Sequence, residues 1–268
     1  MQPVRAYGLV NGRGLATLIG RGLWRHLHMW VHSLGGAAVS NLLFLTVLVL
    51  ARDAALGPVW VDAAGRAYDA ASFVAPGLIA YAACHAAFET VAMYLVWDKM
   101  EGVVQDLLSA PLTAAELLAG WVLGATLAGF ASGAAVTLVF LPFVDWPWPD
   151  PLPLLGFGLL GLLLFALLGV LVGLWARKWD HYAAAETFLL LPLGLLSGTF
   201  FLRQDLPPLG QDLLFANPVF HVIDGIRSGF LGRSDGEPLF AALLLLGLVT
   251  ALSLVAWRLV LRGWHLKP

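Results

Sequence analysis

Six long hydrophobic segments, separated by short polar stretches, dominate the pattern of the chain. They cover residues 31–50, 73–97, 117–144, 152–175, 183–202 and 239–261. The hydrocarbon core of a bilayer is about 30 Å thick, and a helix needs roughly 20 apolar residues to cross it. The pattern therefore predicts an all-α polytopic membrane protein, with six transmembrane helices in a single transmembrane domain over residues 1–268.

Residues 1–30 carry an apolar stripe with basic residues between its members. The stripe recurs near helical spacing and consists of Leu15, Leu18, Ile19, Leu23, Leu27 and Trp30. Such a stripe is typical of an amphipathic helix that lies in the headgroup layer of a membrane. We therefore expect a cytoplasmic interfacial helix here; a solvated lead-in to the first span is the alternative. The stretch is too poor in apolar residues for a cleavable signal peptide.

The distribution of basic residues predicts the orientation. Overall, 60% of the residues are hydrophobic and 12% are charged. With six spans, the two termini and the loops after the second and fourth segments share one side, which carries ten basic residues: Arg5, Arg13, Arg21, Arg25, Lys99, Arg177, Lys178, Arg258, Arg262 and Lys267. The other side carries five: Arg52, Arg66, Arg203, Arg227 and Arg233. The positive-inside rule then places both termini in the cytoplasm.

Residues 98–116, between the second and third segments, are too polar for a span and too patterned for a plain linker. One face of a short helix here is apolar and consists of Val103, Val104, Leu107 and Leu108. The polar residues Glu101, Gln105 and Asp106 lie elsewhere. Pro111 ends this helix, and Thr113 with Glu116 predicts a capping box that starts the next. A short amphipathic helix of this kind suits docking in a groove of another protein. A connector that only covers the base of the bundle is the alternative.

The fifth segment contains Pro192, Gly194 and Gly198, which favour a bend or a break in the helix. Residues 203–238 then hold two modest apolar stretches, split by Asn217–Pro218, and neither is long enough to span. We expect re-entrant helices on the outer side. A weakened helix and short, poorly anchored hairpin helices are where an outer gate opens at least cost; a passive lid is the alternative.

Ionisable residues inside the spans are functional candidates by default. Glu89 lies deep in the second segment, one turn after His85, and it fits either a polar contact within the bundle or the translocation path. A proton-coupled secondary transporter or channel that uses Glu89 and His85 is the rival function, although internal repeat symmetry is absent. We expect Glu186, near the start of the fifth segment, to pair with Arg177, Lys178 or lipid headgroups.

The third segment carries a face of small residues, which allows the close approach of another helix. The face comprises Gly124, Ala125, Ala128, Gly129, Ser132 and Gly133. Six spans without an internal repeat provide half of a pathway between equivalent halves, so we expect a two-fold homodimer. The small-residue face either forms that dimer or packs within one subunit.

Three stretches resemble the permease subunits of type 2 ABC exporters. They read FVAPGL, AFETVAMYLVWDKMEGVVQDLLSAPLTAAELLAGW and LLPLGLLSGTFFLRQDLPPL…ANPVFHVIDGIRSGFLG. The resemblance is closest to the branch that holds nodulation lipo-oligosaccharide exporters, polysaccharide exporters and multidrug-type permeases. It implies a coupling helix on an ATP-binding subunit, outer re-entrant helices over the translocation path, and two permeases with two nucleotide-binding subunits.

From this resemblance and the residues themselves we expect two sets of site residues. The candidates for coupling to the ATPase are Asp98, Lys99, Glu101, Val104, Gln105, Asp106 and Leu108. The candidates for the translocation path or gate are Glu89, Ser197, Gly198, Phe200, Phe201, Asn217 and Pro218.

The sequence lacks the motifs that a hydrolytic enzyme of this size would need. It contains no G-x-x-x-x-G-K-[ST] phosphate loop and no H-E-x-x-H, and it has only three lysines. We therefore expect no catalytic residue, no metal site and no nucleic-acid partner, with ATP and Mg²⁺ bound by a partner subunit. The expected location is the bacterial inner membrane among its lipids. An amphipathic lipid, a glycolipid or polysaccharide, and a hydrophobic drug all fit as the substrate.

Overall fold

The computed structural model describes residues 10–56, 59–61, 67–144, 150–201, 203, 206–232 and 234–266. Helix α3 (Ala70–Met100) runs through the middle of the bundle, and most of its side chains are buried. Helices α5 (Ala114–Phe140) and α6 (Pro151–Trp175) pack along it. A Cβ added at Gly129 would lie 2.5 Å from the carbonyl oxygen of Ala83, and one at Gly169 would lie 2.6 Å from that of Phe88. These glycines let α5 and α6 approach the α3 backbone closely.

Within the described residues, five helical stretches are long and apolar enough to cross a membrane. They are Val31–Ala51, Ala70–Met100, Ala114–Phe140, Pro151–Trp175 and Pro238–Leu261. The first joins the π-helix η1 (Val31–Gly36) to α2 (Ala37–Leu56), and the last is α11 (Pro238–Leu261). Five of the six expected segments therefore coincide with long helices, with boundaries that differ by a few residues.

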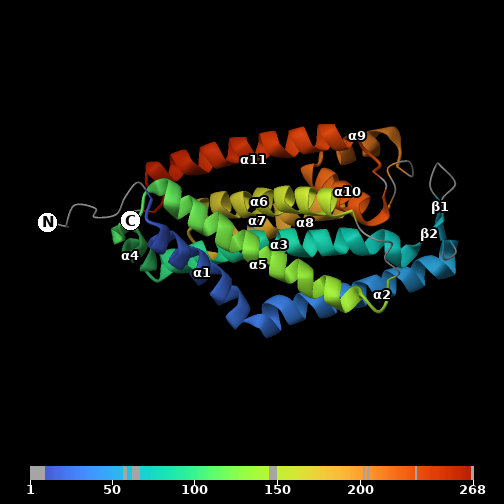
Figure 1. Ribbon diagram of the computed structural model, residues 1–268, viewed down its shortest axis with the longest axis horizontal. Helices are drawn as coiled ribbons and strands as arrows, with labels where there is room; N and C mark the ends of the chain where they lie inside the picture. The colour runs from blue at the N-terminus through green and yellow to red at the C-terminus, as the bar shows by residue number, and fades with distance from the viewer. Residues whose placement is uncertain are drawn as a thin grey trace.

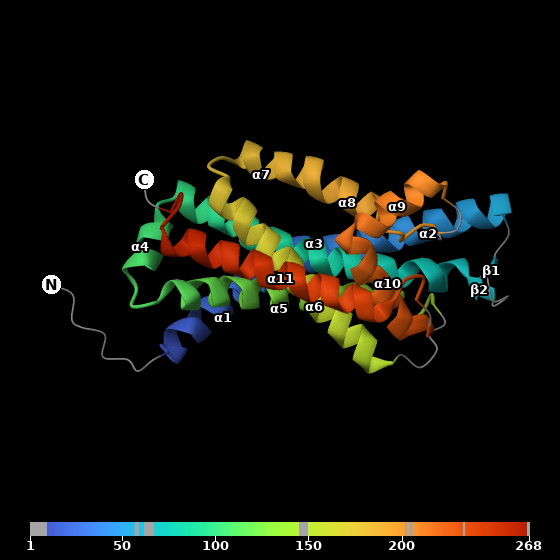
Figure 2. The ribbon, with the colours of Figure 1, turned by 90° about the horizontal axis from the view of Figure 1, so that it is seen from above.

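The expected fifth span has a different shape. The chain is helical from α7 (Trp179–Ala185) through the π-helix η2 (Glu186–Leu190) to α8 (Leu191–Leu195), and the helix ends there instead of reaching residue 202. The wide turn directly precedes Pro192, which has no N–H to donate to the carbonyl of Phe188. Figure 2 shows this run lying lengthwise along the bundle. The predicted break is present, and the crossing of the membrane by this run stays a prediction.

Helix α1 (Gly12–His28) packs against α5 and turns into η1 and α2 (Figure 1). The small-residue face of α5 is occupied within the chain: Gly124 lies against Ile19 and Gly22 of α1, and Gly133 lies against Ala83 of α3. Of the two alternatives for this face, packing within one subunit is therefore correct. The interfacial position of α1 is a prediction still, and residues 1–9 of the expected segment lie outside the described residues.

The two ends of the bundle differ in their short elements (Figure 1). One end holds α4 (Val103–Ser109), the start of α1 and the end of α11. The other end holds α9 (Pro208–Ala216), α10 (Pro218–Leu231) and an antiparallel pair of strands, β1 (Val59–Val61) and β2 (Ala67–Asp69). This small hairpin is an addition to the expected all-helical fold, and its valines and aromatic residues have high strand propensity.

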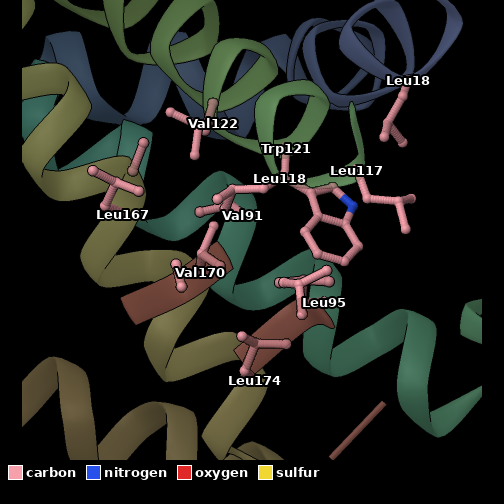
Figure 3. Packing of buried hydrophobic residues seen from close by; sticks show 14 of the residues in the cluster. Leu18, Val91, Leu95, Leu117, Leu118, Trp121, Val122, Leu167, Val170 and Leu174 are labelled. Carbon is pink, nitrogen blue, oxygen red and sulfur yellow. The ribbon is translucent and has the colours of Figure 1, made fainter. Parts of the chain in front are cut away.

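The core near α4 joins six helices. Side chains from α1, α3, α4, α5, α6 and α11 form one buried cluster, in which the Trp121 indole of α5 lies among Leu95, Leu117 and Leu174 (Figure 3). A second cluster joins α3 and α6 to α10 and α11. Both clusters include α3, so this helix is in contact with both ends of the molecule.

Candidate functional site

Asp98, at the end of α3 near α4, is buried and holds α1 in place. Its Oδ1 accepts hydrogen bonds from Arg21 Nη2 and Arg25 Nη1, both at 2.9 Å, and the residue is 4% exposed. The Arg25 guanidinium also lies 4.1 Å from the ring centroid of Tyr94. Asp98 thus serves the contact between α1 and α3, and both hydrogen bonds to its Oδ1 come from arginines of α1.

The neighbouring Lys99 ties α3 to α6. Its Nζ donates to the carbonyl oxygen of Leu174 at 3.0 Å and also to that of Ala176. A positive charge is favourable at this position because the carbonyls at a helix C-terminus carry partial negative charge. Lys99, like Asp98, therefore forms its hydrogen bonds to other helices of the bundle.

Helix α4 presents a polar surface outward from this anchored base. Val104 is 3% exposed and belongs to the core cluster, while the exposed residues of the predicted coupling set are Glu101, Gln105, Asp106 and Leu108. We call these four residues the α4 outer face. A partner that docks here meets two carboxylates and an amide beside one leucine.

The predicted capping box at Thr113 is present, and it does more than start α5. Glu116 Oε2 accepts from the Thr113 N–H at 2.6 Å, and the Glu116 N–H donates back to Thr113 Oγ1 at 3.3 Å. Glu116 Oε1 also accepts from the N–H of Asn11 at 2.6 Å, and Asn11 is the N-cap of α1. One carboxylate therefore joins the starts of α1 and α5, a link that sequence spacing gave no sign of.

His26 of α1 is a buried contact that the sequence analysis missed. Its Nε2 lies 2.9 Å from Ser132 Oγ of α5 and its Nδ1 lies 3.1 Å from Thr90 Oγ1 of α3. Burial lowers the pKa of His26 to about 4, so the imidazole is neutral at physiological pH. A histidine within a basic, amphipathic stretch is a weak signal, because only the fold brings the two hydroxyls to it.

The candidate gate residues after α8 are mostly buried. Ser197 Oγ donates to the carbonyl of Gly194 at 2.5 Å, as expected of a hydroxyl beside a broken helix. Gly198 has φ +72, a conformation that favours glycine, and its carbonyl accepts from Arg227 Nη2 of α10 at 2.8 Å. Phe200 and Phe201 are partly exposed, and the Phe200 ring lies 5.3 Å from that of Phe44 in α2.

Asn217 fastens α10 to α8. Its Nδ2 donates to the carbonyls of Leu193 at 2.8 Å and Leu196 at 2.6 Å, and its Oδ1 accepts from the N–H of Val219 at 3.0 Å. Pro218 is the first residue of α10, where a missing N–H costs nothing.

Most side chains of α10 are buried against α3, α6 and α11. The expectation of poorly anchored hairpin helices is therefore wrong for α10, because long-range packing supplied an anchor that helix length did not reveal.

Midway along α3, three ionisable residues come together. His85 Nε2 lies 3.2 Å from Glu186 Oε1 at the start of η2, and His85 Nδ1 lies 4.0 Å from Glu89 Oε2. Tyr182 of α7 forms a further hydrogen bond with Glu186. The expected pairing of Glu186 with Arg177 or Lys178 is wrong, since η2 packs beside α3 and brings Glu186 to a residue 101 positions away.

Comparisons with known proteins agree on one family. Residues 17–231 match the pattern of the family described as ABC-2 type transporter. The chain is 30% identical over 256 residues to the inner membrane transport permease YadH of Escherichia coli (strain K12), which covers 94% of this chain and 96% of that protein. It is 30% identical over 234 residues to nodulation protein J of Rhizobium leguminosarum bv. viciae, with 82% of this chain and 87% of that protein covered.

Proposed function

The chain belongs to the ABC-2 type transporter family, and we propose that it is the membrane-spanning permease of an ATP-driven exporter. In this proposal two copies form a homodimer in the bacterial inner membrane and assemble with two copies of a nucleotide-binding subunit. That subunit binds ATP and Mg²⁺, and this chain supplies the path. The six segments of the hydropathy pattern cross the membrane, with α7 to α8 as the fifth, and both termini are cytoplasmic.

The α4 outer face is the observation that carries the proposal. Gln105, Asp106 and Leu108 are the exposed part of a short helix whose other side is packed into the core through Val104, and Glu101 is the exposed C-cap of α3 just before it. The residues just before it, Asp98 and Lys99, are bonded to α1 and α6. A movement of α4 caused by a bound partner would therefore be transmitted to α3, and through Asp98 and Lys99 to α1 and α6.

For the substrate, the proposal covers several chemical classes. An amphipathic lipid, a glycolipid or polysaccharide-type molecule, or a drug-like amphiphile moves outward by alternating access of the homodimer. Glycolipids and polysaccharides enter this class by analogy with the exporters that the three stretches of the sequence resemble.

The test is reconstitution of the purified chain in liposomes with its cognate nucleotide-binding subunit. We expect ATP hydrolysis by that subunit to rise several-fold when the chain is present. A proton-coupled transporter using Glu89 and His85 would instead leave hydrolysis unchanged and move protons under an imposed pH gradient. That second result would replace the exporter proposal with the rival function.

A further inference from the structure

Helix α3 is buried on nearly every side except along one open stripe. The partly exposed residues of this stripe recur every four positions: Tyr81, His85, Glu89, Met93 and Trp97. Residues four apart lie on the same face of a helix. The central helix therefore has one long open face, and that face carries an imidazole, a carboxylate and two aromatic rings.

The open stripe differs from the other exposed faces of the bundle. On α11 the exposed positions include Leu239, Leu243 and Leu246, and on α2 they include Leu43 and Val47. Such side chains suit contact with lipid tails. A carboxylate costs a few kcal/mol at the centre of a bilayer, and charged residues there face the protein interior or a water-filled space.

The cost of a charge at the bilayer centre applies to this cluster because His85 lies in the middle of its helix. It is the middle residue of a helix of 31 residues, so it lies about 22 Å from either end at 1.5 Å per residue. The side chains of His85, Glu89 and Glu186 are 29%, 31% and 38% exposed. By the rule given above, these partly exposed side chains face protein or water at membrane depth and not lipid tails, as the residues of a translocation path do.

The second element that contributes to this cluster is the helix that carries Glu186. The helix widens into η2 at Glu186 itself, and π-turns are frequent at functional sites. Near the end of α8, a Cβ at Gly194 would lie 2.3 Å from the Tyr81 ring, so this helix approaches α3 closely. The carboxylates of Glu89 and Glu186 thus flank His85 from two different elements.

The charge of the cluster selects the ligand. Two carboxylates and one imidazole retain a net negative charge even when His85 is protonated. No Lys or Arg of the described chain forms an ion pair with Glu89 or Glu186 in the structure. The ring of Tyr81, whose centroid lies 5.9 Å from that of His85, offers a face that attracts cations.

We propose that His85, Glu89 and Glu186 form a binding site, within the translocation path, for the cationic head of an amphipathic substrate. The proposal rests on the exporter function proposed above and narrows its substrate class. The ammonium or other organic cation contacts the two carboxylates, and its apolar part lies along Met93 and Trp97 of the open stripe. His85 keeps the two carboxylates apart when the site is empty.

The test compares two probes of the same shape and opposite charge, tetraphenylphosphonium and tetraphenylborate. Their binding is measured at equilibrium on the full-length chain in lipid nanodiscs, with empty nanodiscs as the reference for partition into lipid. We expect saturable binding of tetraphenylphosphonium alone. The affinity should fall about tenfold in Glu89→Gln or Glu186→Gln and further in the double variant. Asp212→Asn, at an exposed position of α9, is the matched control and should bind as the wild type does.

One further variant keeps the test decisive. If the double variant does not fold, Glu89→Asp retains the charge and should retain most of the affinity that Glu89→Gln loses. Binding of both probes alike, or binding that ignores all these substitutions, would overturn the site. Because no ATPase is present in the assay, a failed site with intact ATPase stimulation contradicts this inference alone, while a working site without stimulation contradicts the exporter proposal alone.

Discussion

At the scale of single residues, the structure depends on a few polar side chains that join helices far apart in sequence. Asp98, Glu116 and His26 each connect α1 to a long helix of the bundle. A buried acceptor or donor that loses its partner costs more than an exposed one, because water does not replace the bond. Substitutions at these positions should therefore affect stability before they affect transport.

Asp98→Asn should destabilise the folded chain. The substitution leaves Arg21 and Arg25 without the carboxylate that both contact, and we expect a loss of about 1 to 3 kcal/mol, reduced from a fully buried pair because both arginines are partly exposed. Thermal unfolding in detergent measures the effect. Asp106→Asn, on the exposed α4 outer face, is the control and should stay within about 0.5 kcal/mol of the wild type. Equal unfolding temperatures for the two variants would contradict the role of Asp98.

His26 predicts a dependence of stability on pH. Its pKa is about 4 in the folded chain and 6.5 when unfolded. As the pH falls below 6.5 the unfolded chain takes up a proton that the folded chain does not, so stability declines until about pH 4, by about 3 kcal/mol in all. Unfolding curves between pH 7 and 4 should show a smaller decline in His26→Gln than in the wild type. Parallel curves for the two proteins would show that His26 is not buried in neutral form.

At the scale of elements, the hydropathy pattern predicted the long helices because apolar length is a local property. The capping box at Thr113 and the break near Pro192 were predictable for the same reason. The meeting of His85 with Glu186, and that of His26 with Ser132, were not, since they depend on which helices pack together. The anchoring of α10 through Asn217 and Arg227 likewise arises from packing and not from the short apolar stretch itself.

The α4 outer face should couple this chain to its ATPase. Charge reversal in the double variant Glu101→Arg/Asp106→Arg should abolish most of the ATPase stimulation while the chain remains inserted and dimeric, because neither residue contributes to the core. ATPase activity in proteoliposomes measures the effect, with the exposed Asp212→Arg on α9 as the control. Intact stimulation in the double variant would exclude the α4 outer face as the coupling surface.

The segment after α8 is the predicted outer gate, and a disulfide crosslink between the two copies tests it. A cysteine at Gly198 would be strained, because the residue has φ +72 and a Cβ there would lie 3.0 Å from the Phe220 ring. Phe201→Cys is the better probe, since Phe201 is partly exposed. Oxidation to a disulfide across the two-fold axis should block export and reduction should restore it. Free export with the crosslink complete would place the opening elsewhere.

At the scale of the whole molecule, one chain provides half of the proposed homodimeric transporter. The bundle carries the α4 outer face at one end, the open stripe along its central helix and the anchored helix α10 at the other end. A second copy is expected to cover the stripe and complete the path, because a single chain leaves ionisable side chains open at membrane depth. Apolar composition predicted a membrane protein, and the resemblance of three stretches to type 2 ABC permeases predicted the class of transporter. The fold added the cluster of His85, Glu89 and Glu186, on which the proposed cationic substrate rests.

The most direct test of the central claim is the native mass of the complex. The chain, purified in lipid nanodiscs with its cognate nucleotide-binding subunit, should give the mass of two copies of each. The double variant Glu101→Arg/Asp106→Arg should give a dimer of this chain without the ATPase. A stable monomer, or a complex whose composition ignores the α4 substitutions, would contradict the account.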